Sequence, residues 1–566
     1  MRRPFATAAV AAFAAPAVAA LAVATLSPLA LPSQQRPAAR AAAAAAAPMS
    51  PAALRDRLER YTADSMRGRL TGTADHRRAT AYIASELRAM GLEPAGESGT
   101  FLQRVPLITT VLDTATSSIT AAGSTLTPYV DYLPRNQGPR GRLVEGAEVI
   151  YAGVWGAPGL LGGADVRGKA VIVSTPLDNS TVIKLQAQAQ FAQAAAIIVA
   201  NFDLMDPSLR AALASAAMVL DDGSAPSGPE LPGYLHITRA TAARILGVGD
   251  LADARIGASG TPIQGQYRFK PQPVESYNVV ALLRGSDPSL REEMVAIGAH
   301  SDHVGVGAPE DRDSTRAFQL ELRRKQLETG GPATAELAAS VHVNMDSIRA
   351  LYPTPRLDSI YNGADDDGSG SMGILEVARA FAAQRERPKR SILFVWHAGE
   401  ELGLFGAEHF TDHPTVDRDK IVAQLNLDMI GRGGPGEEVN GGPNYIQLIG
   451  SRRLSTQLGD MVERVSREKG FNWDFDYQYD ATGHPEQFYC RSDHYMYARY
   501  GIPIVFMSTG GHADYHQVTD EVQYIDFDKL AKVSRYTFEL ATAVANAAER
   551  PLVDKPKPNP RGNCVQ

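Results

Sequence analysis

Apolar residues recur with helical spacing near the start of the globular part of the chain. The spacing of Leu54, Leu58 and Tyr61, continued by later apolar positions, predicts helix over residues 52–95. This helical region would close at Gly91, because glycine is favoured just after a helix end.

After Pro271, apolar runs of strand length alternate with stretches of helical length. Near-continuous apolar strands alternating with helices predict an α/β fold, with a mainly parallel mixed sheet covered by helices on both faces. Such sheets carry their functional residues at the carboxyl ends of the strands. The predicted strands are 278–283, 294–299, 391–396, 421–427, 445–449 and 502–507, and the predicted helices lie near 370–384, 400–410, 454–468, 492–499 and 527–548.

Residues 115–270 have a different character, with short apolar strands between turns rich in Gly and Pro. They predict an inserted, β-rich α/β domain with its own core. The main domain would then be discontinuous, formed by residues 48–114 and 271–550. Lys- and Pro-rich composition predicts a disordered tail over residues 551–566.

Residues 308–356 interrupt the regular alternation of strands and helices. The stretch from Arg312 to Lys325 is highly charged and lacks a clear apolar face. A long insertion of this kind predicts a surface excursion, which could act as a lid.

The first residues resemble an export signal. Two arginines precede a run rich in Ala, Val and Leu over residues 5–31, and several Ala-x-Ala sites follow. This pattern predicts a signal peptide within residues 1–47 and a secreted or periplasmic protein. The run is also long enough to span a membrane, so an N-terminal anchor is the alternative. Pro16, Pro28 and the alanine content favour cleavage.

Composition narrows the function further. A chain of 566 residues that is 44% hydrophobic can bury an extensive core and form several domains. The net charge of -7 and the lack of long Lys/Arg runs argue against nucleic acid and against an anionic membrane as partners. The two cysteines, Cys490 and Cys564, rule out a Cys-based zinc site, although export would permit a disulfide between them.

Acidic and histidine side chains follow the predicted strands. His300 and Asp302 end the strand 294–299, and residues two apart on an extended chain share a face. Asp302 can therefore orient the His300 ring or join it at a metal. Glu400 and Glu401 follow the strand 391–396, where a carboxylate pair is costly to bury without a cation. Taken alone, this pair could instead be the acidic first turn of a helix.

Further acidic residues complete the pattern. Three carboxylates, Asp365–Asp367, stand side by side before a helix and repel one another unless a cation is present, although an acidic loop at a helix start is the simpler alternative. Asp428 follows the strand 421–427, and a His-rich loop follows the strand 502–507. Each could be structural alone, but their recurrence at four strand ends indicates a shared cation.

Six motifs, in this order, resemble those of the co-catalytic di-zinc aminopeptidase family, which includes bacterial secreted leucyl aminopeptidases and glutamate carboxypeptidase II. The motifs are AHSDH (299–303), YNGADDDGSG (361–370), GEELGLFG (399–406), NLDMIG (426–431), RSDHY (491–495) and DYHQVTDE (514–521). The resemblance spans residues 50–110 and 272–548 and implies a zinc exopeptidase fold. Residues 115–270 resemble the protease-associated domain that is often inserted there.

The resemblance implies a ligand set for two Zn²⁺ ions. Asp366 would bridge the two metals. Glu401 and His516 would complete one site, and His300 and Asp428 the other. All of these donors are nitrogen or oxygen, which suits zinc and is also compatible with Mn or Co.

The family pattern also implies roles around the metals. Glu400 would act as general base on a hydroxide-forming water between the metals, Asp302 would orient His300, and Tyr489 would stabilise the oxyanion. A cis peptide bond is expected after Asp366. The other histidines of the motifs are expected to be structural: His303, His397, His409, His494 and His512.

These features predict an exported zinc exopeptidase, most directly an aminopeptidase that acts on the N-terminus of a peptide or protein. The same scaffold serves carboxypeptidases and dipeptidases, and the choice depends on whether the substrate pocket offers an acidic or a basic partner. Glutaminyl cyclases use one zinc, which the five-ligand set disfavours. A non-catalytic binding module is disfavoured because every ligand position is retained. The oligomeric state stays open.

Overall fold

A computed structural model of the chain describes residues 47–135, 146–176, 190–205, 210, 213, 218–221, 232–330 and 334–566. The described chain forms two compact units. The described residues of 107–274 make up the first unit, and residues 47–106 together with those of 275–566 make up the second. The predicted signal peptide lies outside the described residues except for Ala47. No helix within the described part is both long and apolar enough to cross a membrane.

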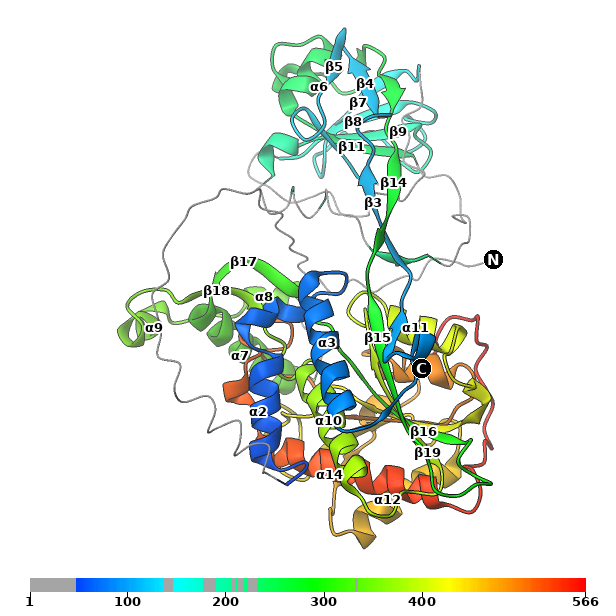
Figure 1. The fold of residues 1–566 in the computed structure, drawn as a ribbon. Coiled ribbons are helices and arrows are strands. Elements are labelled where there is room, and N and C mark those ends of the chain that lie inside the picture. Colours follow the sequence, from blue (N-terminus) through cyan, green and yellow to red (C-terminus); the bar gives the residue numbers. More distant parts are fainter. Residues whose placement is uncertain are drawn as a thin grey trace, which may run out of the picture. The chain divides into compact units, whose positions relative to one another are not determined.

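The second unit is built on a nine-stranded mixed sheet (Figure 1). Its order is β1 (Glu93–Pro94), β15 (Tyr277–Leu283), β19 (Ser391–His397), β16 (Met294–His300), β20 (Ile421–Leu427), β23 (Ile504–Ser508), β21 (Tyr445–Ile449) and β22 (Asp474–Asp476), and β2 (Leu102–Arg104) also pairs with β15. The central strands β19, β16, β20 and β23 run parallel, whereas β15 and β21 flank them antiparallel. The predicted α/β class, with a mainly parallel mixed sheet, is confirmed.

Helices cover both faces of this sheet, and its central strands are therefore buried along their whole length. Successive strand residues point to opposite faces, so Val295 and Ile297 join one core and Ala296 joins the other. The first core also contains α2 (Pro51–Tyr61), α3 (Ala74–Ala89), α10 (Gly368–Ala383), α12 (Thr456–Glu468) and α14 (Phe527–Asn546), and the second contains α11 (Phe405–Asp412) and α13 (His494–Ala498).

The helix predicted over residues 52–95 is two helices, α2 and α3. Between them lies a short 3₁₀ segment in which Arg67, Gly68 and Arg69 adopt positive φ values of 46°, 64° and 47°. The side chain of Thr73 then caps α3 by accepting the His76 N–H. Apolar spacing continues across the break, which is why periodicity alone does not reveal it.

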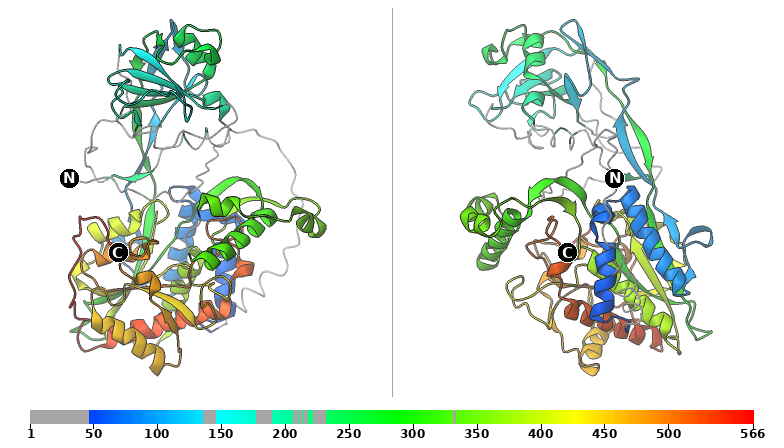
Figure 2. Two further views of the ribbon diagram at one scale, coloured as in Figure 1. Left: turned by 180° about the vertical axis from the view of Figure 1, so that it is seen from behind. Right: turned by 60° about the vertical axis from the view of Figure 1, so that its left-hand side comes forward.

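The insertion after β16 forms an arm, defined here as residues 305–361. Strands β17 (Gly305–Asp311) and β18 (Leu357–Tyr361) pair antiparallel at its base. Helices α7 (Arg312–Thr329), α8 (Ala335–Ala339) and α9 (Met345–Leu351) lie between them and extend from the body of the unit (Figure 2). As the lack of an apolar face suggests, α7 buries a single residue, Leu322.

The first unit has its own core around a six-stranded sheet. Its order is β12 (Ser259–Gly260), β7 (Val149–Val154), β8 (Ala170–Ser174), β9 (Ala196–Ala200), β11 (Gly233–Ile237) and β6 (Tyr132–Pro134). Strands β8 and β9 are fully buried, and α6 (Arg239–Leu246) contributes to the same core. Two three-stranded sheets complete the unit: β10 (Val219–Leu220), β3 (Leu107–Leu112) and β14 (Phe269–Val274), and β13 (Gln264–Gln266), β4 (Ser118–Ala121) and β5 (Ser124–Leu126). The resemblance to a protease-associated domain stays an expectation.

Residues 551–566, predicted as a disordered tail, contain no helix or strand but are tied to the second unit. Cys564 forms a disulfide with Cys490. The Gln566 side chain accepts the Tyr489 N–H at 2.9 Å and donates to the Tyr479 carbonyl at 2.6 Å. Composition predicted disorder here because these anchors depend on partners far away in the sequence.

The disulfide should contribute measurably to stability. It closes a loop with a sequence separation of 74 residues, and the chain-entropy model gives up to about 4 kcal/mol for a loop of that size. Reduction should therefore lower the thermal unfolding midpoint of the second unit by several degrees. The double variant C490S/C564S should unfold at the midpoint of the reduced protein and should not respond to reductant. An unchanged midpoint on complete reduction would contradict the contribution.

Candidate metal centre

The parallel strands bring the predicted site residues to one edge of the sheet. Strands β19, β16, β20 and β23 are neighbours, and their carboxyl ends lead to Glu400 and Glu401, to His300, to Asp428 and to the loop that carries His516. Asp366 joins them from the turn before α10. Residues separated by more than 200 positions in sequence therefore meet in space.

Asp366 lies between the two histidines. Its Oδ1 atom is 3.1 Å from Nε2 of His300, and its Oδ2 atom is 3.0 Å from Nε2 of His516. Asp428 Oδ1 lies 3.7 Å from Nε2 of His300, and Glu401 Oε2 lies 2.9 Å from Nε2 of His516. Asp366 thus contacts both histidines, and the donor atoms close enough to hold an ion form two groups: His303, Asp366, Glu401 and His516, and His300, Asp367 and Asp428.

These residues fit two bound cations. The Nε2 atoms of His300 and His516 are buried and have no hydrogen-bond partner among the described residues. Donor atoms that share one tetrahedral zinc ion lie about 3.3 Å apart, given bond lengths near 2.0–2.1 Å. The separations between donor atoms given above, from 2.9 to 3.7 Å, lie on both sides of that value. The geometry and the nitrogen and oxygen donors suit zinc, with Mn or Co as chemically compatible substitutes.

The orientation of His300 is determined by its other ring nitrogen. Nδ1 donates to the backbone carbonyl of Asp302 at 3.1 Å, which directs Nε2 toward Asp366. The Asp302 carboxylate lies 3.7 Å from the same Nδ1 and also accepts the Glu400 N–H at 3.3 Å. Asp302 therefore connects the ends of β16 and β19, and its predicted orienting role stays a prediction.

Two further carboxylates hold the backbone of the Asp366 turn. Asp520 accepts the N–H groups of Asp365 and Asp366 at 3.0 Å. Asp367 accepts the His300 N–H at 3.1 Å and the Gly370 N–H at 2.9 Å, and so caps α10 while it contacts β16. The peptide bond between Asp366 and Asp367 is cis, as the resemblance implies.

The electrostatics of the site favour positive charge. Burial alone would lower the pKa of His300, but the surrounding carboxylates, first Glu400 and then Asp302 and Asp366, outweigh it and raise that pKa well above its usual value. Burial also opposes the charge on His516, yet the Glu401 carboxylate raises its pKa well above the ordinary range. The negative potential that retains a proton on each ring would equally attract a metal cation at Nε2.

Glu400 and Glu401 lie in a turn before α11 rather than in its first turn, since α11 begins at Phe405. The helix-start interpretation of the pair is therefore wrong. Burial raises the pKa of Glu400 well above its usual value, and the carboxylates of Asp428 and Glu401 add to this shift. Glu400 Oε2 is 3.9 Å from Nε2 of His300, one of the residues that would hold a metal.

His303, which the motif pattern left as a structural residue, contacts the centre. Its Nδ1 atom lies 2.7 Å from Oε1 of Glu401, and the two oxygens of Glu401 are thereby divided between His303 and His516. Its donor atoms group with those of Asp366, Glu401 and His516 within 4.8 Å. The ring packs against Gly363, where any Cβ atom would lie 2.5 Å from it. Only its position in the AHSDH motif signalled this role.

The predicted oxyanion residue Tyr489 is not brought into this cluster. Its ring packs 4.3 Å from the Arg453 guanidinium and 5.9 Å from the His494 ring, within the second core. Tyr515, which the sequence did not single out, stacks on the His516 ring at 4.0 Å. Arg491 donates to its hydroxyl at 3.5 Å. Its position directly before His516 was the available signal.

The remaining histidines of the motifs pack within the protein. His512 Nε2 lies 3.2 Å from Asp365 Oδ2, His397 Nδ1 lies 3.2 Å from Asp493 Oδ2, and His494 stacks on Phe506. His409 lies beside His413. These contacts are of the structural kind expected for them.

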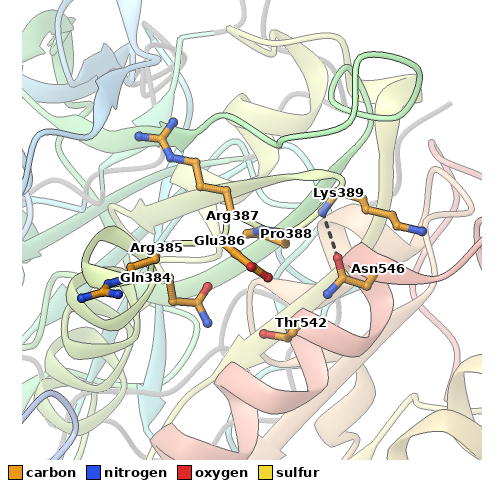
Figure 3. A pocket seen from close by; sticks show the side chains of 8 residues that line it. All are labelled: Gln384, Arg385, Glu386, Arg387, Pro388, Lys389, Thr542 and Asn546. Carbon is orange, nitrogen blue, oxygen red and sulfur yellow. Dashed lines mark hydrogen bonds between the residues drawn. The ribbon is translucent and has the colours of Figure 1, made fainter.

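A cavity of about 580 Å³ lies elsewhere, between the end of α10 and the end of α14 (Figure 3). Its lining residues are Gln384, Arg385, Glu386, Arg387, Pro388, Lys389, Thr542 and Asn546. None of them is a predicted site residue, so the cavity does not belong to the metal centre.

Part of this chain is similar in sequence to known proteins. Leupeptin-inactivating enzyme 1 of Streptomyces exfoliatus is 30% identical over 182 residues, which is 31% of this chain and 36% of that protein. Leucine aminopeptidase 1 of Aspergillus fumigatus is 30% identical over 228 residues, which is 38% of this chain and 54% of that protein. The chain thus spans about half or less of the length of these curated relatives.

Solved structures show a distant likeness. An aminopeptidase from Aneurinibacillus sp. strain AM-1 aligns with a TM-score of 0.46 and 14% identity over 90% of this chain and 97% of that chain. A zinc aminopeptidase from Bacillus subtilis aligns with a TM-score of 0.44 and 15% identity over 88% and 95%. The fold class rests on the order and direction of the strands in the central sheet.

The family comparison covers the region that contains the site. Residues 278–541 match the model described as Peptidase family M28. All five predicted metal ligands and Glu400 lie within these residues. The part of the chain that carries the candidate metal centre is therefore the part that matches peptidase family M28.

Proposed function

We propose that the protein is an exported metallo-exopeptidase that holds two Zn²⁺ ions and removes N-terminal residues from peptides. The observation that carries this proposal is the position of Asp366, whose two oxygens face two buried histidine nitrogens that make no hydrogen bond within the described part of the chain. A carboxylate placed in this way is suited to bridge two metals. Export through the predicted signal peptide belongs to the same proposal.

Bound zinc would supply Lewis acidity, polarising the scissile carbonyl and making a water molecule more acidic. Glu400 is the residue placed to move the proton. Its carboxylate lies 3.9 Å from Nε2 of His300, where it could take a proton from water and return it to the leaving amine. Glu401, paired with His303 and His516, is held for binding rather than for proton transfer.

Tyr515 is better placed than Tyr489 to stabilise negative charge on the substrate oxygen. It stacks on a proposed metal ligand, and its hydroxyl accepts from Arg491. Tyr489 contacts Arg453 in the second core instead. We keep the oxyanion role assigned to Tyr489 as the competing hypothesis, and the two tyrosines can be compared directly.

Arg491 favours a second candidate function. Its guanidinium lies beside Tyr515 and also interacts electrostatically with Glu400. A guanidinium near the reacting groups can bind a substrate α-carboxylate in bidentate fashion. This would suit a dipeptidase or carboxypeptidase built on the same scaffold, whereas an aminopeptidase needs a carboxylate for the α-amine.

Replacing the proposed base should separate metal binding from catalysis. The variant Glu400→Gln should keep its zinc content and lose at least about 10²–10⁴-fold in kcat, the usual contribution of a general base. Zinc is quantified by mass spectrometry and turnover by a peptide assay. Glu386→Gln, at an exposed position remote from the ligands, is the matched control and should behave as the unmodified protein. Full activity in Glu400→Gln would refute the assigned role.

A substrate panel should decide the direction of cleavage. Amino-acyl anilides, N-blocked peptides and dipeptides with free or amidated C-termini are assayed with and without a metal chelator. An aminopeptidase hydrolyses the anilides and requires a free α-amine, and the chelator abolishes turnover. Cleavage of N-blocked peptides that depends on a free C-terminus would replace this proposal with the carboxypeptidase alternative.

The tyrosines are distinguished by paired substitutions. Tyr515→Phe should lower kcat by roughly 10–10³-fold, because loss of one oxyanion donor costs up to that much. Tyr489→Phe should leave kcat nearly unchanged. KM and zinc content are measured for both variants. The opposite ranking of the two kcat values would restore Tyr489 to the role.

A further inference from the structure

The arm contacts the loop that carries His516. We propose that Arg316, on helix α7 of the arm, is a positioning residue for His516, so that the arm completes the metal centre. This inference rests on the proposed function, since it treats His516 as a zinc ligand. It assigns a role to residues 305–361, which lie outside the sheet that carries the other ligands.

The contact is a two-pronged ion pair with a buried carboxylate. Nε of Arg316 donates to Oδ1 of Asp514 at 3.0 Å, and Nη2 donates to Oδ2 at 3.5 Å. The Asp514 side chain is fully buried, and that of Arg316 keeps 26% of its surface exposed. A planar guanidinium matches a carboxylate in this way, which a lysine cannot reproduce.

The body of the unit provides a formed binding site for the Arg316 guanidinium. Its Cζ atom lies 3.9 Å from the centre of the Tyr524 ring, so the cation is held between an aromatic face and the Asp514 carboxylate. Arg432 also donates to Asp514 Oδ2, at 3.0 Å, and the Thr519 hydroxyl donates to Oδ1, at 2.8 Å. Without Arg316, the Oδ1 atom of this buried carboxylate would keep only the Thr519 hydroxyl among these partners.

Asp514 is in turn part of the tight turn that presents His516. The Gln517 N–H donates to the Asp514 carbonyl at 3.0 Å, and the Asp514 N–H donates to Nδ1 of His512 at 3.2 Å. His516 itself has a φ of 55°, in the left-handed region that non-glycine residues seldom occupy. A backbone in this region persists where several surrounding contacts hold it in place. The contact of Arg316 with Asp514 is one of these contacts.

Other arginines of the arm reach the same region. Arg312 donates to Glu521 at 3.0 Å, five residues beyond His516. Arg323 donates to the Glu437 carbonyl at 3.1 Å and pairs with the buried Glu438, in the loop that follows Asp428. Since α7 buries only Leu322, these polar contacts rather than an apolar face determine where the arm lies. They connect it to the loops that follow both β20 and β23.

The test compares three variants of the full chain for zinc retention and kinetics. Arg316→Gln removes both the positive charge and the planar guanidinium that contacts two carboxylate oxygens. Arg316→Lys keeps the charge alone. Arg324→Gln is the matched control, because Arg324 is exposed on the same helix and pairs with Glu321 and Glu328 of α7 itself. Zinc stoichiometry, the rate of zinc loss to a chelator, kcat and KM are measured, with thermal unfolding as a check on folding.

We expect Arg316→Gln to bind one of its two zinc ions about 10–100-fold more weakly, the usual effect of losing a group that orients a ligand. Arg316→Lys should recover part of the loss, and Arg324→Gln should match the unmodified protein. The combined variant Arg316→Gln/Asp514→Asn should lose less than the sum of the two single losses, because Arg316 and Asp514 contact each other. If Arg316→Gln folds and retains both zinc ions as the unmodified protein does, the inference is overturned while the proposed function stands. Failure of the unmodified protein to bind two zinc ions would overturn both.

Discussion

Carboxylates that are buried together at the edge of the central sheet impose the constraint on which the rest of the structure depends. The side chains of Asp366, Glu401 and Asp428 keep only 5%, 6% and 12% of their surface exposed. Like charges in a medium of low dielectric repel strongly unless a cation compensates them. Two divalent cations would bring four positive charges to three carboxylates, which is the physical reason to expect metals there.

The neighbouring acidic residues bind backbone N–H groups of the surrounding segments. Asp367 and Asp520 accept backbone N–H groups, and Asp365 accepts the Gly431 N–H at 2.7 Å while it faces the His512 ring. Three consecutive aspartates therefore have separate tasks. The outer two hold the backbone of surrounding segments, and Asp366 alone points both of its oxygens at histidines. Holding the backbone firmly is what allows this one carboxylate to keep a bridging position.

The centre is built from elements of unequal rigidity. His300, at the end of β16, and Asp428, directly after β20, are placed by strands buried on both faces. His516 lies on a loop and depends on contacts made by its neighbours, among them Asp514. An ion pair at an exposed surface contributes little to stability. An ion pair that ends on a buried carboxylate cannot be lost without weakening the compensation of that buried charge. The Arg316 ion pair ends on the buried carboxylate of Asp514. Loss of the arm contact would therefore leave a buried charge with fewer partners in the loop that carries His516.

The sequence by itself determined the central strands, the α/β class and the five predicted ligands that meet with Glu400 at the sheet edge. Continuous apolar runs identify buried strands because burial on both faces leaves no polar positions, and ordered motifs identify Asp366, Glu401 and the other predicted ligands. Only the tertiary structure decided what depends on distant partners. The break between α2 and α3, the contact of His303 with Glu401, the place of Tyr515, the anchored C-terminal residues and the pairing of Arg316 with Asp514 all belong to this group. Local periodicity reports which face of an element is buried. The partner of a single charged or aromatic side chain can lie far away in the sequence, and only the folded chain specifies which partner it meets.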